Sequence, residues 1–119
     1  MFQRFKKRPV RIVIADDDDD MRQFLETLLA AEGAVVMAFE NGQLALEAIR
    51  ADKPDLVVLD VEMPVMGGFE VLRELREDEK TKDLKVAMLT IKSGKPHVVG
   101  GLLIGADDYI IKGTPADQL

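Results

Sequence analysis

Five short apolar runs alternate along this chain with segments of helical spacing, and this alternation leaves few possible folds. The runs are nearly continuous in apolar character, as in parallel strands that are buried on both faces. They are Val10–Ala15, Ala34–Phe39, Leu56–Leu59, Val86–Leu89 and Tyr109–Ile111. Because parallel neighbours need a long crossover, usually a helix, the alternation predicts a doubly wound α/β sheet of five parallel strands.

The intervening segments carry apolar residues at the spacing of one helix face. The three expected core stripes are Met21, Phe24, Leu25, Leu28 and Leu29; Ala45, Ala48 and Ile49; and Phe69, Leu72 and Leu75. We expect a fourth helix near Pro96–Ile104. A last helix should begin at Thr114, where a capping hydroxyl precedes proline, yet the sequence ends at Leu119. We therefore expect the final helix to be truncated.

Bulk composition excludes several classes of protein. The chain has 119 residues, enough for one core, and no cysteine for a disulfide or thiolate metal site. Residues 1–9 form a basic tail without the apolar centre of a secretion signal, ahead of a domain at 10–119. No apolar run approaches the roughly 18 residues of a membrane span. A net charge of −6 argues against direct nucleic acid binding. The absence of cysteine and of a secretion signal fits a cytoplasmic domain.

Polar side chains follow four of the five runs, at the point where each strand should end. They are Asp16 and Asp17, Asp60, Thr90 and Lys112, whereas the second run ends in Phe39 and Glu40. Ligands of open parallel sheets bind beyond the carboxyl ends of the strands, near the point where strand order reverses. The strand order 2-1-3-4-5 would make neighbours of the four strands that end in these polar residues. We therefore predict a single cleft that contains all of these groups.

The chemistry of this cleft would centre on a cation and an anion. Three carboxylates repel one another by about 1–4 kcal/mol per pair at a surface-like dielectric constant, and a hard cation relieves that repulsion. Oxygen ligands favour Mg2+, with Mn2+ as the other candidate. Lys112 and the Thr90 hydroxyl would contact an anion on the metal, as in phosphoryl transfer. Helix capping or a solvated surface explains each group alone, but not four groups at one edge.

At these positions the sequence resembles the receiver domains of bacterial two-component response regulators. The likeness covers about residues 10–119 and implies a flavodoxin-like form of the sheet. The matching stretches are Ile12-Val13-Ile14-Ala15-Asp16-Asp17-Asp18, Asp55-Leu56-Val57-Val58-Leu59-Asp60, Met63-Pro64-Val65-Met66-Gly67-Gly68, Met88-Leu89-Thr90 and Gly105-Ala106-Asp107-Asp108-Tyr109-Ile110-Ile111-Lys112.

The resemblance implies a role for each matching residue. Asp60 would accept a phosphoryl group from the histidine of a sensor kinase or phosphotransfer protein. Asp16, Asp17, Asp60 and the backbone carbonyl of Glu62 would hold Mg2+, and Lys112 would contact the phosphoryl oxygens. The chain would then be a switch that assists its own phosphorylation and dephosphorylation, and not a metabolic enzyme.

The resemblance also implies how the signal would leave the site. Thr90 would move toward the phosphoryl group, and Tyr109 would turn inward behind it. The surface around the fourth helix and fifth strand would change as a result. The segment Val98–Ile104 is more apolar than a half-exposed helix requires, so we expect a homodimer through the fourth helix.

The sequence departs from the family pattern beside the cleft. Gly113 stands where the family usually has proline, and Ile91 stands where it favours a small residue. Glu62 and Lys92 occupy the two variable positions that flank the cleft. The branched side chain of Ile91 would hinder attacking water, and Glu62 and Lys92 could pair across the opening. We therefore expect slow dephosphorylation.

Two other functions compete with the switch. A degenerate receiver would bind proteins without being phosphorylated, and the departures at Ile91 and Gly113 keep this alternative open. An aspartyl phosphohydrolase would use Asp60 and Glu62 as an acidic pair, but it would need its nucleophile on the first strand and a large cap. The chain is too short for such a cap.

Overall fold

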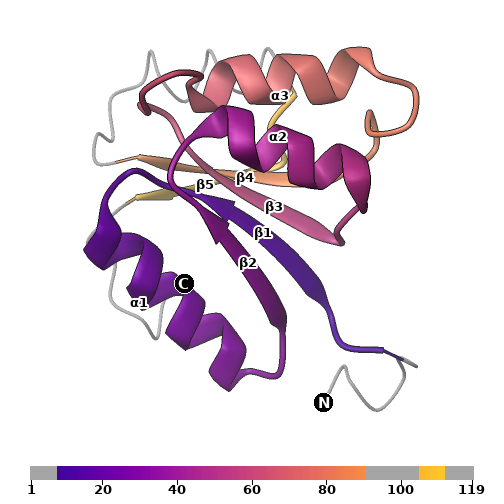
Figure 1. Cartoon of the computed structure of the whole chain (residues 1–119). Helices are drawn as coiled ribbons and strands as arrows, with labels where there is room; N and C mark the ends of the chain where they lie inside the picture. The colour runs from indigo at the N-terminus through magenta and orange to yellow at the C-terminus, as the bar shows by residue number, and fades with distance from the viewer. Residues whose placement is uncertain (1–7, 91–104, 112–119) are drawn as a thin grey trace.

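Five parallel strands form one sheet in the computed structural model, which describes residues 8–90 and 105–111. The strands are β1 (Arg11–Ala15), β2 (Val35–Phe39), β3 (Leu56–Asp60), β4 (Lys85–Thr90) and β5 (Asp108–Ile111). Their order is β2-β1-β3-β4-β5 (Figure 1). The predicted doubly wound sheet and its strand order are confirmed, and each strand begins and ends within one residue of its apolar run.

Within the described residues, three helices cover the two faces of the sheet. They are α1 (Asp19–Ala31), α2 (Gly42–Ala51) and α3 (Gly68–Glu77). Helices α2 and α3 lie together on one face, and α1 lies on the other (Figure 1). None of these three helices, nor any other helix in the described part of the chain, has the length and apolarity to cross a bilayer. The expected fourth helix and truncated last helix lie outside the described residues.

The core is divided by the sheet into a large and a small cluster. On the face of α2 and α3, the buried residues include Ile49, Leu72 and Leu75, as their helical spacing predicts. On the other face, Leu25 is the buried residue of α1, and Met21 and Leu29 pack partly against the sheet.

The prediction of a core position was wrong for Phe24, which is 42% exposed. One residue corresponds to about 100° around a helix with 3.6 residues per turn. Because Leu25 faces the sheet, Phe24 is turned to the flank of α1. The predicted apolar stripe of α1 is therefore wider than the part of the helix that contacts the sheet.

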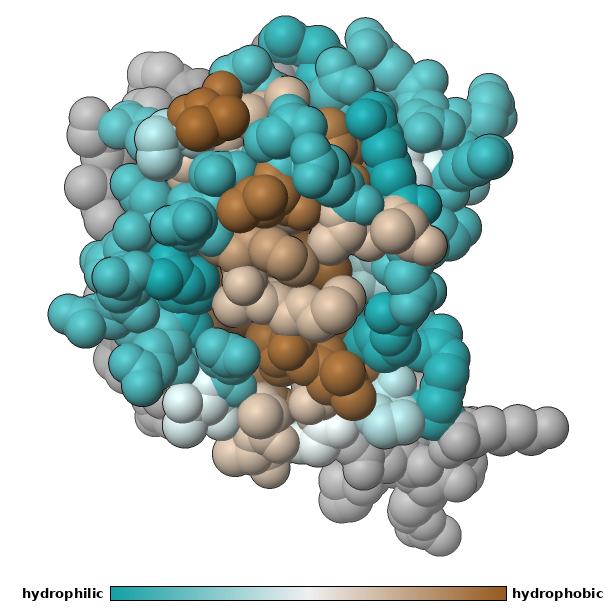
Figure 2. All heavy atoms as spheres, in the orientation of Figure 1, coloured by the Kyte–Doolittle hydropathy of each residue, from teal (hydrophilic) through white to brown (hydrophobic). Residues whose placement is uncertain are grey.

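Strand β2 forms an edge of the sheet, and it leaves an apolar strip at the surface. Figure 2 shows this strip between α1 and α2. Val35 is 48% exposed, and the remaining four residues of β2 are half-buried. A continuous apolar run therefore indicates full burial only for the inner strands β1, β3 and β4, which have neighbours on both sides.

Candidate functional site

The register of the sheet brings the predicted site residues to one edge. Ala15 pairs with Leu59 across β1 and β3, so Asp16 and Asp60 follow side by side. Asp60 in turn pairs with Leu89, the residue that precedes Thr90 at the end of β4. Parallel strands with matching ends thus place two acids and one hydroxyl at the carboxyl edge, as predicted.

Three carboxylates meet at this edge. One oxygen from each of Asp16, Asp17 and Asp60 lies within 4.8 Å of the other two. Asp16 and Asp60 are buried, whereas Asp17 is exposed, so the acidic cluster (Asp16, Asp17 and Asp60) opens to solvent on one side. Negative charges this close repel one another, and the donors are hard oxygens. The donor set fits Mg2+ or Mn2+, which favour carboxylates and water.

The acids between Asp16 and Asp20 do not all have the same role: two belong to the acidic cluster, and one caps α1. The Asp18 side chain accepts hydrogen bonds from the backbone N–H groups of Asp20 and Met21, and so caps α1. Capping, the commonplace explanation for the whole run, therefore holds for Asp18. Asp16 and Asp17 belong to the cluster.

Arg22, which no sequence pattern singled out, supports the loop that carries Asp16 and Asp17. Its guanidinium donates a hydrogen bond of 2.7 Å to the backbone carbonyl of Asp16 and forms an ion pair with Asp19. The Asp18 N–H also donates to Asp16 Oδ1 at 3.0 Å. The spacing of three residues between Asp19 and Arg22 was the available signal, since such pairs meet on a helix surface.

Gly68 lies against the backbone of Asp60, a contact that the sequence analysis also missed. A Cβ atom at Gly68 would lie 2.1 Å from the Asp60 carbonyl oxygen and 2.9 Å from Met88 Cε. The Gly68 N–H donates to the carbonyl of Val61 at 3.0 Å. The beginning of α3 is thus held directly behind the end of β3, where only glycine fits.

Of the remaining predicted residues, some lie within the described part of the chain and others lie outside it. Thr90 is buried at the end of β4, and the backbone of Tyr109 pairs with Met88 in β5. Glu62 is exposed just beyond Asp60. Lys112 follows Ile111, the partner of Thr90 in the sheet, but it lies outside the described residues, as do Ile91, Lys92 and Gly113.

Comparison with known proteins gives a consistent family match. The model of the response regulator receiver domain matches residues 12–119. The chain is 41% identical over 111 residues to response regulator MprA of Mycolicibacterium vanbaalenii, covering 93% of this chain and 47% of that protein. It is also 41% identical over 102 residues to the DNA-binding response regulator MtrA of Mycolicibacterium smegmatis, covering 86% of this chain and 43% of that protein.

Solved structures agree with these sequence relatives. A putative response regulator from Chloroflexus aurantiacus superposes with a TM-score of 0.89 at 31% identity, covering 93% of this chain and 91% of the other. The receiver domain of a histidine kinase from Syntrophus aciditrophicus gives 0.83 at 31% identity, covering 92% and 83%. The chain spans less than half the length of MprA and MtrA, so the likeness concerns one domain of those proteins.

Proposed function

Because this chain belongs to the response regulator receiver domain family, we propose that Asp60 is the phosphoacceptor of a two-component signalling switch. The observation that carries the proposal is the cluster of three carboxylates at the carboxyl edge of the sheet, with Asp60 at the end of β3. Phosphoryl transfer depends chiefly on positioning and on neutralising charge, which this arrangement supports.

The ligands for a divalent cation would be Asp16, Asp17, Asp60 and the backbone carbonyl of Glu62. Mg2+ is the expected ion, with Mn2+ as the other candidate, because all of these donors are oxygens. When bound, the ion would neutralise the charge of the phosphoryl oxygens. Arg22 would keep the Asp16 backbone in place through its 2.7 Å hydrogen bond.

In the transfer step, a carboxylate oxygen of Asp60 would attack the phosphorus of a phosphohistidine on a sensor kinase or phosphotransfer protein. A P–O bond would form as the P–N bond breaks, and the imidazole nitrogen would keep the electron pair. Lys112 would contact the phosphoryl oxygens from the end of β5, and the Thr90 hydroxyl would donate to them.

The switch would follow from the charge that phosphorylation adds. A doubly charged phosphoryl group recruits nearby donors, so Thr90 would move toward it and Tyr109 would turn inward. The face around the expected fourth helix and β5 would then present a different surface to an effector. Homodimerisation through Val98–Ile104 remains part of this proposal.

Dephosphorylation by water should be slow in this chain. Ile91 follows Thr90 in the sequence, where a smaller residue would leave more room, and Glu62 and Lys92 would flank the opening. Radiolabel loss from the phosphorylated chain in Mg2+ measures the lifetime. A lifetime of minutes would contradict this part of the proposal, and Ile91→Ala should shorten it.

Phosphorylation with acetyl phosphate and Mg2+, followed by intact-mass measurement, tests the assignment. The wild-type chain should gain one phosphoryl group, and Asp60→Asn should gain none. Asp52→Asn, which changes an exposed acid beyond the end of α2, serves as the control and should be phosphorylated normally. An unmodified wild-type chain would indicate a degenerate receiver, and a modified Asp60→Asn variant would place the acceptor elsewhere.

A further inference from the structure

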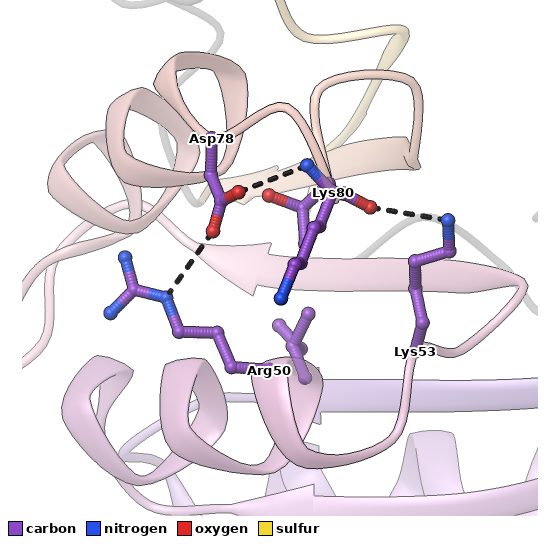
Figure 3. A pocket seen from close by; sticks show the side chains of 6 residues that line it. Arg50, Lys53, Asp78 and Lys80 are labelled. Carbon is purple, nitrogen blue, oxygen red and sulfur yellow. Dashed lines mark hydrogen bonds and ion pairs between the residues drawn. The ribbon is translucent and has the colours of Figure 1, made fainter.

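A hollow of about 430 Å3 lies at the end of the molecule opposite the acidic cluster. It opens between the last turn of α2 and the loop that joins α3 to β4 (Figure 3). The residues that line it are Ile49, Arg50, Lys53, Asp78, Lys80 and Thr81. Its volume is in the range of small-molecule binding sites, and the proposed phosphoryl transfer does not use it.

Two of the three cations in this lining have partners that explain them. The Arg50 guanidinium lies 2.9 Å from Glu74 Oε1 and 3.9 Å from Asp78 Oδ2. Lys53 Nζ donates to the backbone carbonyl of Lys80 at 3.1 Å. Both residues also lie near the carboxyl end of α2, where the helix dipole favours positive charge.

Lys80 is exposed, and it is the cation of this lining whose charged group these local contacts do not engage. Its backbone is held at both polar groups, since its N–H donates to Asp78 Oδ1 at 2.9 Å and its carbonyl accepts from Lys53. Its side chain points into the hollow (Figure 3). Within residues 8–90 and 105–111, no hydrogen bond or ion pair engages the Lys80 ammonium.

Most of the accessible surface of the hollow is apolar. Ile49 is fully buried, and Thr81 is 3% exposed with its hydroxyl already donating to the carbonyl of Leu75 at 2.8 Å. The hollow thus offers apolar surface beside an exposed ammonium that has no protein acceptor within the described residues. This positive lining lies on a chain whose net charge is −6.

We propose that this hollow binds a small organic anion. Its carboxylate or phosphate would pair with the Lys80 ammonium, with Lys53 adding positive potential, and its apolar part would lie against the accessible apolar surface of the lining. A charge-assisted hydrogen bond to Lys80 would supply orientation, and burial of the apolar part would supply affinity. The ligand would bridge α2 and the loop before β4.

Amide NMR titration with benzoate, phenyl phosphate and inorganic phosphate, in the presence of EDTA, tests this site and identifies the anionic group. The two aromatic anions should shift the amides of residues 49–53 and 78–81. Inorganic phosphate should bind more weakly than phenyl phosphate, because it has no apolar part. Lys80→Gln should weaken binding by about tenfold. Lys82→Gln, which removes an exposed lysine outside the lining, should change binding by less than about twofold.

Three results would overturn the proposal. Equal weakening by Lys80→Gln and Lys82→Gln would indicate general attraction to surface charge. Shifts confined to Asp16, Asp60 and Thr90 would place the anion in the phosphorylation cleft instead. If neither aromatic anion shifts the amide signals of the wild-type chain, and its spectrum is well dispersed, the hollow is not a binding site.

Discussion

At the scale of single residues, the backbone around Asp60 allows very little variation. Strand β3 ends at Asp60, and two residues with unusual backbone or packing requirements follow it. Val65 lies in the loop after β3, and Gly68 is the first residue of α3. Gly68 touches the Asp60 carbonyl, and Val65 adopts a φ of 70°, in the left-handed region that a β-branched residue disfavours. Both residues shape the chain that follows Asp60, the proposed phosphoacceptor, and each leads to a test.

Gly68→Ala should lower the free energy of unfolding by about 1–3 kcal/mol, as is typical of overpacking. The added methyl group would meet the Asp60 carbonyl oxygen at 2.1 Å, so it must displace either α3 or the end of β3. Urea denaturation measures the loss. Gly67→Ala is the matched control, since its nearest contact would be 3.1 Å, and its loss should be smaller. Equal losses would mean that the close contact with Asp60 is unimportant.

Val65→Asn should raise the free energy of unfolding by about 1 kcal/mol, because asparagine tolerates the left-handed conformation better than valine. The Val65 side chain is 78% exposed, so little packing is lost. Thermal and urea unfolding measure the gain. Val65→Ala removes the apolar surface but lacks the polar side chain that lets asparagine adopt this conformation, and should gain less. An equal gain in both variants would attribute the effect to the exposed side chain and not to the backbone.

At the scale of elements, Arg76 joins three segments that are distant in the sequence. From the last turn of α3, its guanidinium donates to the carbonyls of Leu84 at 2.8 Å and Gly105 at 2.9 Å. It also pairs with Asp107 at 3.0 Å, and that carboxylate accepts the Val86 N–H at 2.8 Å. Arg76 therefore connects the end of α3 and the beginning of β4 to the turn that leads into β5, the strand that precedes Lys112.

Arg76→Lys should lower the free energy of unfolding by about 1–3 kcal/mol, because an ammonium cannot reproduce the planar set of donors and would leave carbonyls unsatisfied. Relative to wild type, the hydrogen exchange rate should increase more for the amides of β5 than for those of β1. Arg73→Lys provides the control, since Arg73 is exposed on the same helix. Unchanged exchange in β5 would show that Arg76 does not hold this strand.

At the scale of the whole molecule, the sheet separates two regions of opposite charge. The acidic cluster lies beyond the carboxyl ends of the strands, and the hollow with Lys80 lies at the other end. The two regions share no residue, so substitutions in one leave the side chains of the other unchanged.

Mg2+ should stabilise the folded chain, because the cluster exists only when the strand ends are assembled. At a free concentration about 100 times the Kd, the expected gain in the free energy of unfolding is about 2.7 kcal/mol. Asp17→Asn should reduce this gain. Without metal, the same variant should be more stable than wild type by about 1 kcal/mol, because one repulsive charge is removed. Calorimetry with and without Mg2+ measures both effects.

Glu26→Gln is the control for the magnesium experiment, since it removes an exposed acid of α1 outside the cluster. It should respond to Mg2+ as wild type does. If Asp17→Asn and Glu26→Gln gain equally from Mg2+, the ion acts through general screening of the negative chain and not through the cluster.

Apolar periodicity and the chemistry of the strand ends were sufficient to predict the sheet, its strand order and the edge where Asp16, Asp60 and Thr90 lie. These features depend on spacing within a few residues and on general rules for parallel strands, so they can be read locally. The tertiary structure alone decided that Phe24 lies outside the core, that Gly68 touches Asp60, and that Arg76 reaches Gly105. It also brought Ile49 and Lys80 to one hollow. Such contacts join atoms from distant segments, and their geometry depends on how helices pack on the sheet, which no local pattern specifies.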